Sequence, residues 1–202
     1  MQPKFCALLL GTLVSASCAM AQDAAWNNSY QLEAAQKYIE AINALDFANA
    51  SGSEQEFKSL RRAWLLYQSG KYDDAAREYR QAAERYPRSV DARLGQALAL
   101  LGAKRWREAE TVARGTLELA PNSYLALLRM VLAQEGAQDW AAMARSANQL
   151  VQAYNSDATA HLYLARAYAW LGRRTEAMAA YTAVLARNPS QAEAKAYVGA
   201  KS

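Results

Sequence analysis

The chain of 202 residues has few of the side chains that build metal and redox sites, with only 2 Cys and 1 His. These numbers are too small for a zinc, haem or iron–sulfur site of the usual kinds. Val and Ile are also scarce, with 7 and 2 residues, whereas Ala contributes 46. Because β-branched residues favour strands and Ala favours helices, this composition predicts an all-α fold.

An excess of charge of one sign is lacking as well, since 23 basic and 19 acidic side chains give a formal net charge of +4. Such a mixed surface does not favour nucleic acid as a partner. The sequence has no glycine-rich phosphate loop and no nucleophile elbow, and His161 has no Cys or second His at metal-ligand spacing. We therefore expect neither enzymatic activity nor a cofactor.

The first twenty-one residues have the pattern of a secretory signal peptide. Lys4 supplies a positive charge, residues 5–14 form an apolar run, and Ala19-Met20-Ala21 is a small-x-small cleavage site. This run is too short to span a bilayer as a helix. We expect residues 1–21 to be removed, leaving a mature chain that begins at Gln22 and has no cysteine and no transmembrane segment. In a bacterium such a protein is periplasmic or secreted.

An alternative for the same segment is attachment of a lipid to Cys18. The residues Ser15-Ala16-Ser17-Cys18 resemble a bacterial lipobox, in which the Cys becomes the first residue of a lipoprotein. Ser15 stands where that motif usually has Leu, so cleavage after Ala21 is the favoured interpretation. Lipidation would instead place the protein on a membrane face that borders the periplasm.

A period of thirty-four residues organises the rest of the chain. Pro87 and Pro121 are one such period apart, and Pro189 follows after two further periods. No insertion or deletion breaks this register between residues 56 and 191. A constant period of this length indicates stacked copies of one structural unit. The clearest column is the one formed by Leu60, Leu94, Leu128 and Leu162.

Within the period, small and aromatic residues keep fixed positions. The first clear unit has a turn glycine, an aromatic, an alanine, a second aromatic, a second alanine and a proline, namely Gly70, Tyr72, Ala75, Tyr79, Ala82 and Pro87. This order resembles the tetratricopeptide repeat, a helix–turn–helix unit. The resemblance implies an α-solenoid whose helix pairs stack into a right-handed superhelix. The implied repeats are residues 56–89, 90–123, 124–157 and 158–191.

Physical chemistry gives each column a role. Ala75 and Ala109 should lie where helices approach most closely, and the aromatic after the turn, such as Tyr72, should fill the gap between adjacent units. The proline ends the second helix because it has no N–H to donate. Lys104 and Gln138 replace the turn glycine in the two middle units, so we expect those turns to differ slightly from the others.

The two ends of the chain depart from the pattern, as terminal repeats do. Residues 22–55 are one further period long, and we expect a degenerate repeat or an N-terminal capping hairpin there. Residues 192–202 should form a C-terminal capping helix. Together these segments predict roughly eleven helices without a domain boundary.

The family resemblance implies that ligands bind in a concave groove lined by the first helix of each unit. Arg and aromatic side chains are the usual anchors of protein interfaces, and several occupy the implied groove positions. The alternative is that some of the Trp and Tyr residues belong to the core instead. The candidate groove residues are Arg61, Trp64, Tyr67, Arg129, Tyr163, Arg166 and Trp170.

Arg129 and Arg166 are expected to give the groove a positive feature. The sequence places no acidic residue one turn from Arg166, and only Glu135 near Arg129. Family members that clamp a terminal carboxylate use several Lys, Asn and Arg positions, of which only Arg129 matches here, so that role is disfavoured. The resemblance predicts a non-enzymatic scaffold or adaptor of the bacterial cell envelope that binds a partner protein. The alternative is a periplasmic accessory that binds extended peptide or glycan chains during secretion or polysaccharide export.

Overall fold

A computed structural model describes residues 24–200 of the chain, so the predicted signal peptide, Cys18 and residues 201–202 lie outside the described residues. In the described part, a helix at residues 24–34 is followed by ten more helices, and no strand occurs there. The predicted all-α fold is therefore confirmed. None of these helices combines the length and the apolar character needed to cross a membrane.

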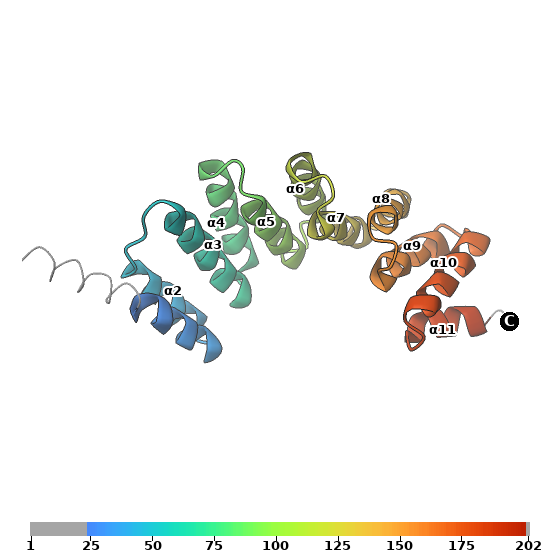
Figure 1. The fold of residues 1–202 in the computed structure, drawn as a ribbon, viewed down its shortest axis with the longest axis horizontal. Coiled ribbons are helices and arrows are strands. Elements are labelled where there is room, and N and C mark those ends of the chain that lie inside the picture. Colours follow the sequence, from blue (N-terminus) through green and yellow to red (C-terminus); the bar gives the residue numbers. More distant parts are fainter. Residues whose placement is uncertain (1–23, 201–202) are drawn as a thin grey trace, which may run out of the picture.

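Each helix packs on the next, and the helices follow one another in one elongated row from the blue to the red end of Figure 1. The second helices of successive pairs begin at a constant step of one period, as do the first helices from Val90 onward. The bounds are α2 Tyr38–Asp46, α3 Ser53–Gln68, α4 Tyr72–Arg85, α5 Val90–Gly102, α6 Trp106–Leu119, α7 Tyr124–Gly136, α8 Trp140–Ala153, α9 Ala158–Trp170, α10 Arg174–Arg187 and α11 Ala192–Gly199.

The turn inside each helix pair contains one residue in the left-handed region. Gly70 and Gly172 have φ angles of 78° and 73°, and Lys104 and Gln138 adopt φ angles of 58° and 56°. The two middle turns thus differ only slightly from the others, as expected, and they stay in the left-handed region because the packing of each pair imposes it on a residue with a side chain. Gln36, one period before Gly70, has a φ of 59°, so the N-terminal hairpin turns in the same way.

Small residues and aromatic rings fill the seams between units as expected. Ala109 has no exposed surface at all. A Cβ atom added to Gly102 would lie 2.7 Å from the ring of Tyr72, and one added to Gly136 would lie 2.6 Å from the ring of Trp106. The aromatic after the turn thus packs directly on the backbone of the next unit, where only glycine leaves room for it.

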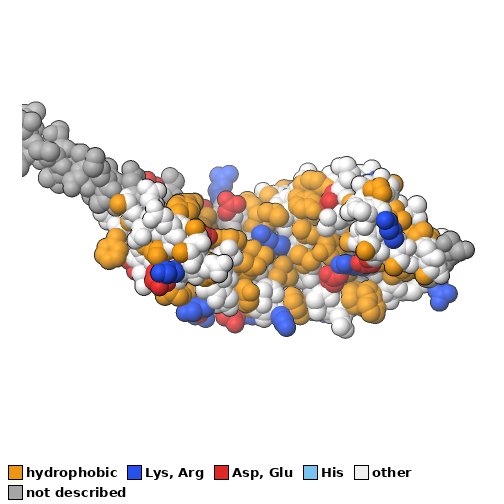
Figure 2. Space-filling model, turned by 90° about the horizontal axis from the view of Figure 1, so that it is seen from below, with side chains coloured by type: hydrophobic (Ala, Val, Ile, Leu, Met, Phe, Trp, Pro, Cys, Tyr) orange, Lys and Arg blue, Asp and Glu red, His pale blue; other side chains and the backbone are white. Residues whose placement is uncertain are grey.

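The first helices of the pairs form an inner layer, in which α5 contacts both α3 and α7, and α7 contacts α9. The row is bowed in Figure 1, with α2 and α11 lying lower than the middle of the row. Figure 2 shows this side from below, where hydrophobic side chains lie across the face with basic and acidic ones among them. We call this face the concave groove.

Candidate functional site

The N-terminal part of the concave groove contains a pocket of about 330 Å³, which we call the aromatic pocket. The helix at residues 24–34 contributes Tyr30, and α3 contributes Phe57, which are 46% and 48% exposed. Aromatic side chains that remain this accessible offer apolar surface to a ligand. The pocket is lined by Tyr30, Phe57, Leu60, Arg61, Trp64, Tyr79 and Asp91.

Arg61 is the buried member of this pocket, with 6% of its surface exposed. Its Nη1 donates to Glu33 Oε2 at 2.9 Å, and its Nε and Nη2 donate to Ser29 Oγ at 3.2 and 3.1 Å. Its guanidinium carbon also lies 3.6 Å from the centre of the Tyr30 ring. The donors of Arg61 are thus occupied inside the chain, where they attach the helix at residues 24–34 to α3.

Trp64 and Tyr67 extend the aromatic wall along α3. Their rings stack with centroids 5.6 Å apart and an interplanar angle of 23°. Trp64 Nε1 donates to Glu33 Oε1 at 2.8 Å, so Glu33 accepts from both Trp64 and Arg61. This shared carboxylate fixes the orientation of the indole that lines the pocket.

Tyr79 reaches the aromatic pocket from a second helix, because α5 has no side chain at Gly95. A Cβ atom at Gly95 would lie 2.2 Å from Tyr79 Cε1. Burial raises the pKa of Tyr79 to about 12, and the charge of Arg129 opposes that shift. We did not predict Tyr79 as a groove residue, although a glycine in the middle of an amphipathic helix is a signal of close approach.

Arg129 is a half-buried cation beside this pocket. Its Nη1 is buried and has no hydrogen-bond partner among the described residues. Burial lowers the pKa of the Arg129 guanidinium, and the nearby Tyr79, Tyr67 and Asp91 act in the opposite direction. Asp91 is exposed and lines the pocket. The half-buried Arg129 side chain forms no ion pair with another described residue, so an acidic group of a ligand that approaches it would be stabilised.

Arg166 lies farther along the groove and is paired with acidic residues. Its Nη2 donates to Glu193 Oε2 at 2.7 Å, and its Nη1 lies 3.3 Å from Glu135 Oε1. The hydrogen bond from Arg166 lowers the pKa of Glu193. No acidic residue of α9 itself pairs with Arg166, but Glu135 of α7 and Glu193 of α11 do, so its charge is not free in the groove. Arg129 and Arg166 do not form one shared positive feature.

The remaining candidates lie on α9. Tyr163 is half-buried, with its ring centre 5.4 Å from the Arg166 guanidinium, and burial raises its pKa. Trp170 is 66% exposed and stacks on Trp140, with ring centroids 5.0 Å apart and an interplanar angle of 9°. Trp170 thus pairs with the preceding helix, α8, whereas Arg61, Trp64, Tyr67 and Arg129 gather around the aromatic pocket.

The aromatic pocket and its surroundings offer groups that can bind a ligand. The pocket provides aromatic surface and the exposed carboxylate of Asp91, and the half-buried guanidinium of Arg129 lies near it. Between residues 24 and 200, no group of three or more His, Cys, Asp or Glu side chains could hold a metal ion. His161 is buried, and its Nε2 lies 3.0 Å from the backbone oxygen of Asn155.

Comparisons with known proteins agree with this architecture. Two models of the tetratricopeptide repeat family match residues 60–124 and 159–190. No curated protein matches the chain. Among solved structures, MamA from Desulfovibrio magneticus RS-1 is similar, with a TM-score of 0.72 and 17% identity over 85% of this chain and 97% of that chain. A thermophilic tetratricopeptide repeat protein of Thermus thermophilus, TTC0263, has a TM-score of 0.61 and 17% identity over 89% of this chain and 98% of that chain.

At these identities the similar structures establish the fold alone. The two family matches fall on the helix pairs α3 to α6 and α9 to α10, whose helices keep the spacing of one period. The family matches, the helix pairing and the solenoid architecture lead to one assignment. The chain belongs to the tetratricopeptide repeat family.

Proposed function

We propose that the chain is a non-enzymatic scaffold of the bacterial cell envelope that binds an extended segment of a partner protein in the concave groove. The observation that carries this proposal is the aromatic pocket beside Arg129, whose half-buried side chain forms no ion pair with another described residue. Aromatic surface next to a guanidinium is the composition of many protein–protein anchor sites.

The charges around the pocket define the segment that fits it. An apolar side chain would fill the space between Tyr30 and Trp64, and an acidic side chain beside it would accept from Arg129. Asp91 is exposed and would suit a basic residue on the same segment. A second candidate is an extended peptide or glycan chain held during secretion or polysaccharide export, which the exposed ring of Trp170 favours because a sugar can stack on it.

The envelope location rests on the signal-peptide pattern of residues 1–21. Mass spectrometry of the protein purified from a bacterial envelope fraction should show an N-terminus at Gln22, because signal peptidase cuts after the small residue Ala21. A diacylglyceryl-modified Cys18 would contradict this prediction and make the protein a lipoprotein.

The groove assignment is tested by reversing the charge at Arg129. A partner is first identified by cross-linking in envelope extracts, and its affinity is then measured by calorimetry with purified proteins. The substitution Arg129→Glu should weaken binding at least about tenfold, because it removes the donor for the acidic side chain and places a like charge there.

The matched control is Arg80→Glu, on α4, where the side chain is 57% exposed. This variant should bind as the original chain does. Unchanged affinity of a folded Arg129→Glu variant would place the partner outside the concave groove. Binding of purified glycans in place of a protein would favour the second candidate.

A further inference from the structure

A second hollow, of about 290 Å³, lies between α8 and the turn that joins α9 to α10. Ala141 and Ala144 line its α8 side, and Leu171 and Arg173 line the side of the turn. It shares no lining residue with the aromatic pocket, so the two sites are separate. We call it the seam pocket, because it lies at the boundary between two repeats.

At the first boundary between clear repeats, an ion pair joins one unit to the next. Arg105, which precedes α6, donates through Nε and Nη2 to the carboxylate of Glu108, with both distances 2.7 Å. Its Nη1 donates to Asp73 Oδ1 of the preceding repeat at 2.9 Å. One guanidinium thus holds two carboxylates, one from its own helix and one from across the boundary.

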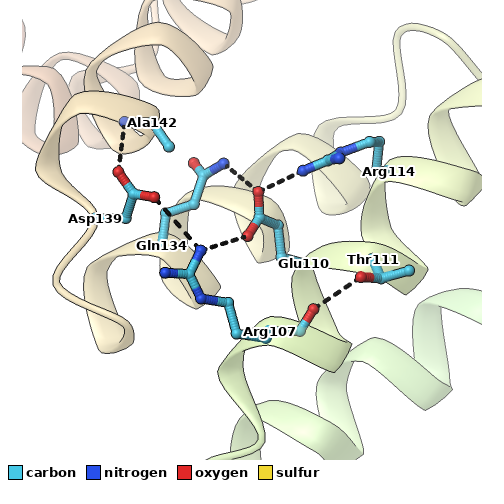
Figure 3. Close-up of polar contacts among 7 residues, drawn as sticks. All are labelled: Arg107, Glu110, Thr111, Arg114, Gln134, Asp139 and Ala142. Carbon is cyan, nitrogen blue, oxygen red and sulfur yellow. Dashed lines mark hydrogen bonds and ion pairs between the residues drawn. The ribbon is translucent and has the colours of Figure 1, made fainter.

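The second boundary keeps this ion pair with its charges exchanged. One period further, the columns of Asp73 and Arg105 hold Arg107 and Asp139. Arg107 Nη1 lies 3.5 Å from Asp139 Oδ2. Figure 3 shows this pair, with the carboxylate of Glu110 beside the same guanidinium. Two successive boundaries therefore place a carboxylate opposite a guanidinium in these columns.

The third boundary has the guanidinium without the carboxylate. Here the same columns hold Ala141 and Arg173. Arg173 donates through Nε and Nη2 to Glu176 Oε1 at 3.0 and 2.7 Å, as the equivalent arginine of the first boundary does to its own helix. Its Nη1 has no hydrogen-bond partner among the described residues, since alanine takes the place of the aspartate.

The guanidinium of Arg173 is accessible and held in position. Its side chain is 49% exposed and lines the seam pocket, so an external group can approach it. The two hydrogen bonds to Glu176 fix one edge of the guanidinium, and its carbon lies 4.5 Å from the centre of the Tyr168 ring. A donor that is already oriented loses less conformational entropy when a ligand binds.

The charges around the seam pocket favour an anion. Arg145, on α8, also lines it and has no hydrogen bond or ion pair with another described residue. No acidic residue lines this pocket, and Glu176 offsets only one of the two arginines. Glu110 and Glu118 line a neighbouring hollow that Arg145 also borders, but neither forms an ion pair with it. One positive charge therefore remains for a ligand.

We propose that the seam pocket binds the carboxylate of an Asp or Glu side chain on a partner polypeptide. This carboxylate accepts from Arg173 Nη1, and Arg145 adds a second positive charge. The exposed side chain of Leu171 offers apolar surface to the methylene groups beside the carboxylate. An acidic side chain is favoured because the chain itself satisfies Arg105, the equivalent residue, with that of Asp73. The site does not depend on the function proposed for the concave groove.

The test is an NMR titration of the full chain, labelled with ¹⁵N, with three probes. These probes are N-acetyl-L-aspartic acid N-methylamide, the corresponding asparagine compound, and inorganic phosphate. The signals followed are the backbone amides of Ala144 and Leu171, which line the pocket and are changed in no variant. The aspartate probe should give saturable shifts with a midpoint on the order of 10 mM, because exposed ion pairs are weak and the probe is small. The asparagine probe should bind at least about fivefold more weakly, because it carries no charge.

Two variants remove the site by different means. Arg173→Gln removes the donor, and Ala141→Asp supplies the carboxylate that the first boundary has, so both should abolish the saturable shifts. Ala141 is exposed in the first turn of α8, where a negative charge is favourable, so the second variant keeps its fold. The matched control is Arg174→Gln, which removes a positive charge from the next residue, outside the pocket, and should retain binding.

Four results would overturn the proposal. They are equal binding of the asparagine probe, tighter binding of phosphate than of the aspartate probe, an unchanged midpoint in the Arg173→Gln or Ala141→Asp variant, and the absence of saturable shifts with the aspartate probe.

Discussion

Replacement of Arg61 by alanine should release the N-terminal hairpin, residues 24–46, from the rest of the solenoid. The change removes three hydrogen bonds to Ser29 and Glu33 and the contact with the Tyr30 ring. Ser29 has no exposed surface, so its hydroxyl would lose its partner without gaining access to water. The free energy of hairpin opening should therefore fall by about 3 kcal/mol.

Hydrogen exchange measured by mass spectrometry would detect this opening. Exchange of the α2 amides should accelerate on the order of a hundredfold, since each increment of about 1.4 kcal/mol is a factor of ten. The helices α7 to α11 should keep their protection, because each unit of a solenoid contacts only its neighbours.

Arg62→Ala is the matched control for this prediction. The Arg62 side chain is 41% exposed and lies 3.4 Å from Asp46, so it also joins α3 to the hairpin, but at the surface. Exposed ion pairs contribute about 0–1 kcal/mol, so this variant should exchange almost as the original chain does. Equal and small effects of both substitutions would show that the buried position of Arg61 is not what holds the hairpin.

The sequence predicted the helix pairs because each structural requirement recurs once in every period. The column that contains Ala109 holds alanine in several repeats, so a chance match to the repeat pattern is excluded. The contacts of Arg61 occur once, and its partners lie in a helix that lacks the repeat pattern. Nothing in the sequence identified Ser29 and Glu33 as those partners, and spacing along one helix likewise missed Glu193 as a partner of Arg166.

The turns within the helix pairs show that one residue type is a weaker predictor of backbone conformation than the repeat pattern. Glycine at Gly70 signals a left-handed residue, and its replacement by Lys104 in the next unit suggested a slightly different turn. The structure keeps both residues in the left-handed region, with φ angles of 78° and 58°. The packing of the two helices outweighs the preference of a single residue, which costs roughly 1–2 kcal/mol in this region. A family pattern therefore predicts the backbone of a repeat better than the identity of one residue does.

The substitution Gly95→Tyr should be among the most destabilising changes in the concave groove. A side chain at Gly95 meets the ring of Tyr79, which is 6% exposed and packed between neighbouring helices. The ring must leave its site or the helices must separate, and overpacking of this kind costs about 3 kcal/mol. Chemical denaturation of the purified variant measures the loss.

The repeat itself supplies the compensating change. Two periods later, the columns of Tyr79 and Gly95 hold Ala147 and Tyr163, so the large residue there lies on the first helix. Tyr79→Ala combined with Gly95→Tyr copies that arrangement and should recover most of the stability that Gly95→Tyr alone loses, because the total volume is restored. If the losses of the two substitutions were additive in the double variant, residues 79 and 95 would not fill the same volume between α4 and α5. Compensation between these two positions would then not explain why glycine occurs at residue 95.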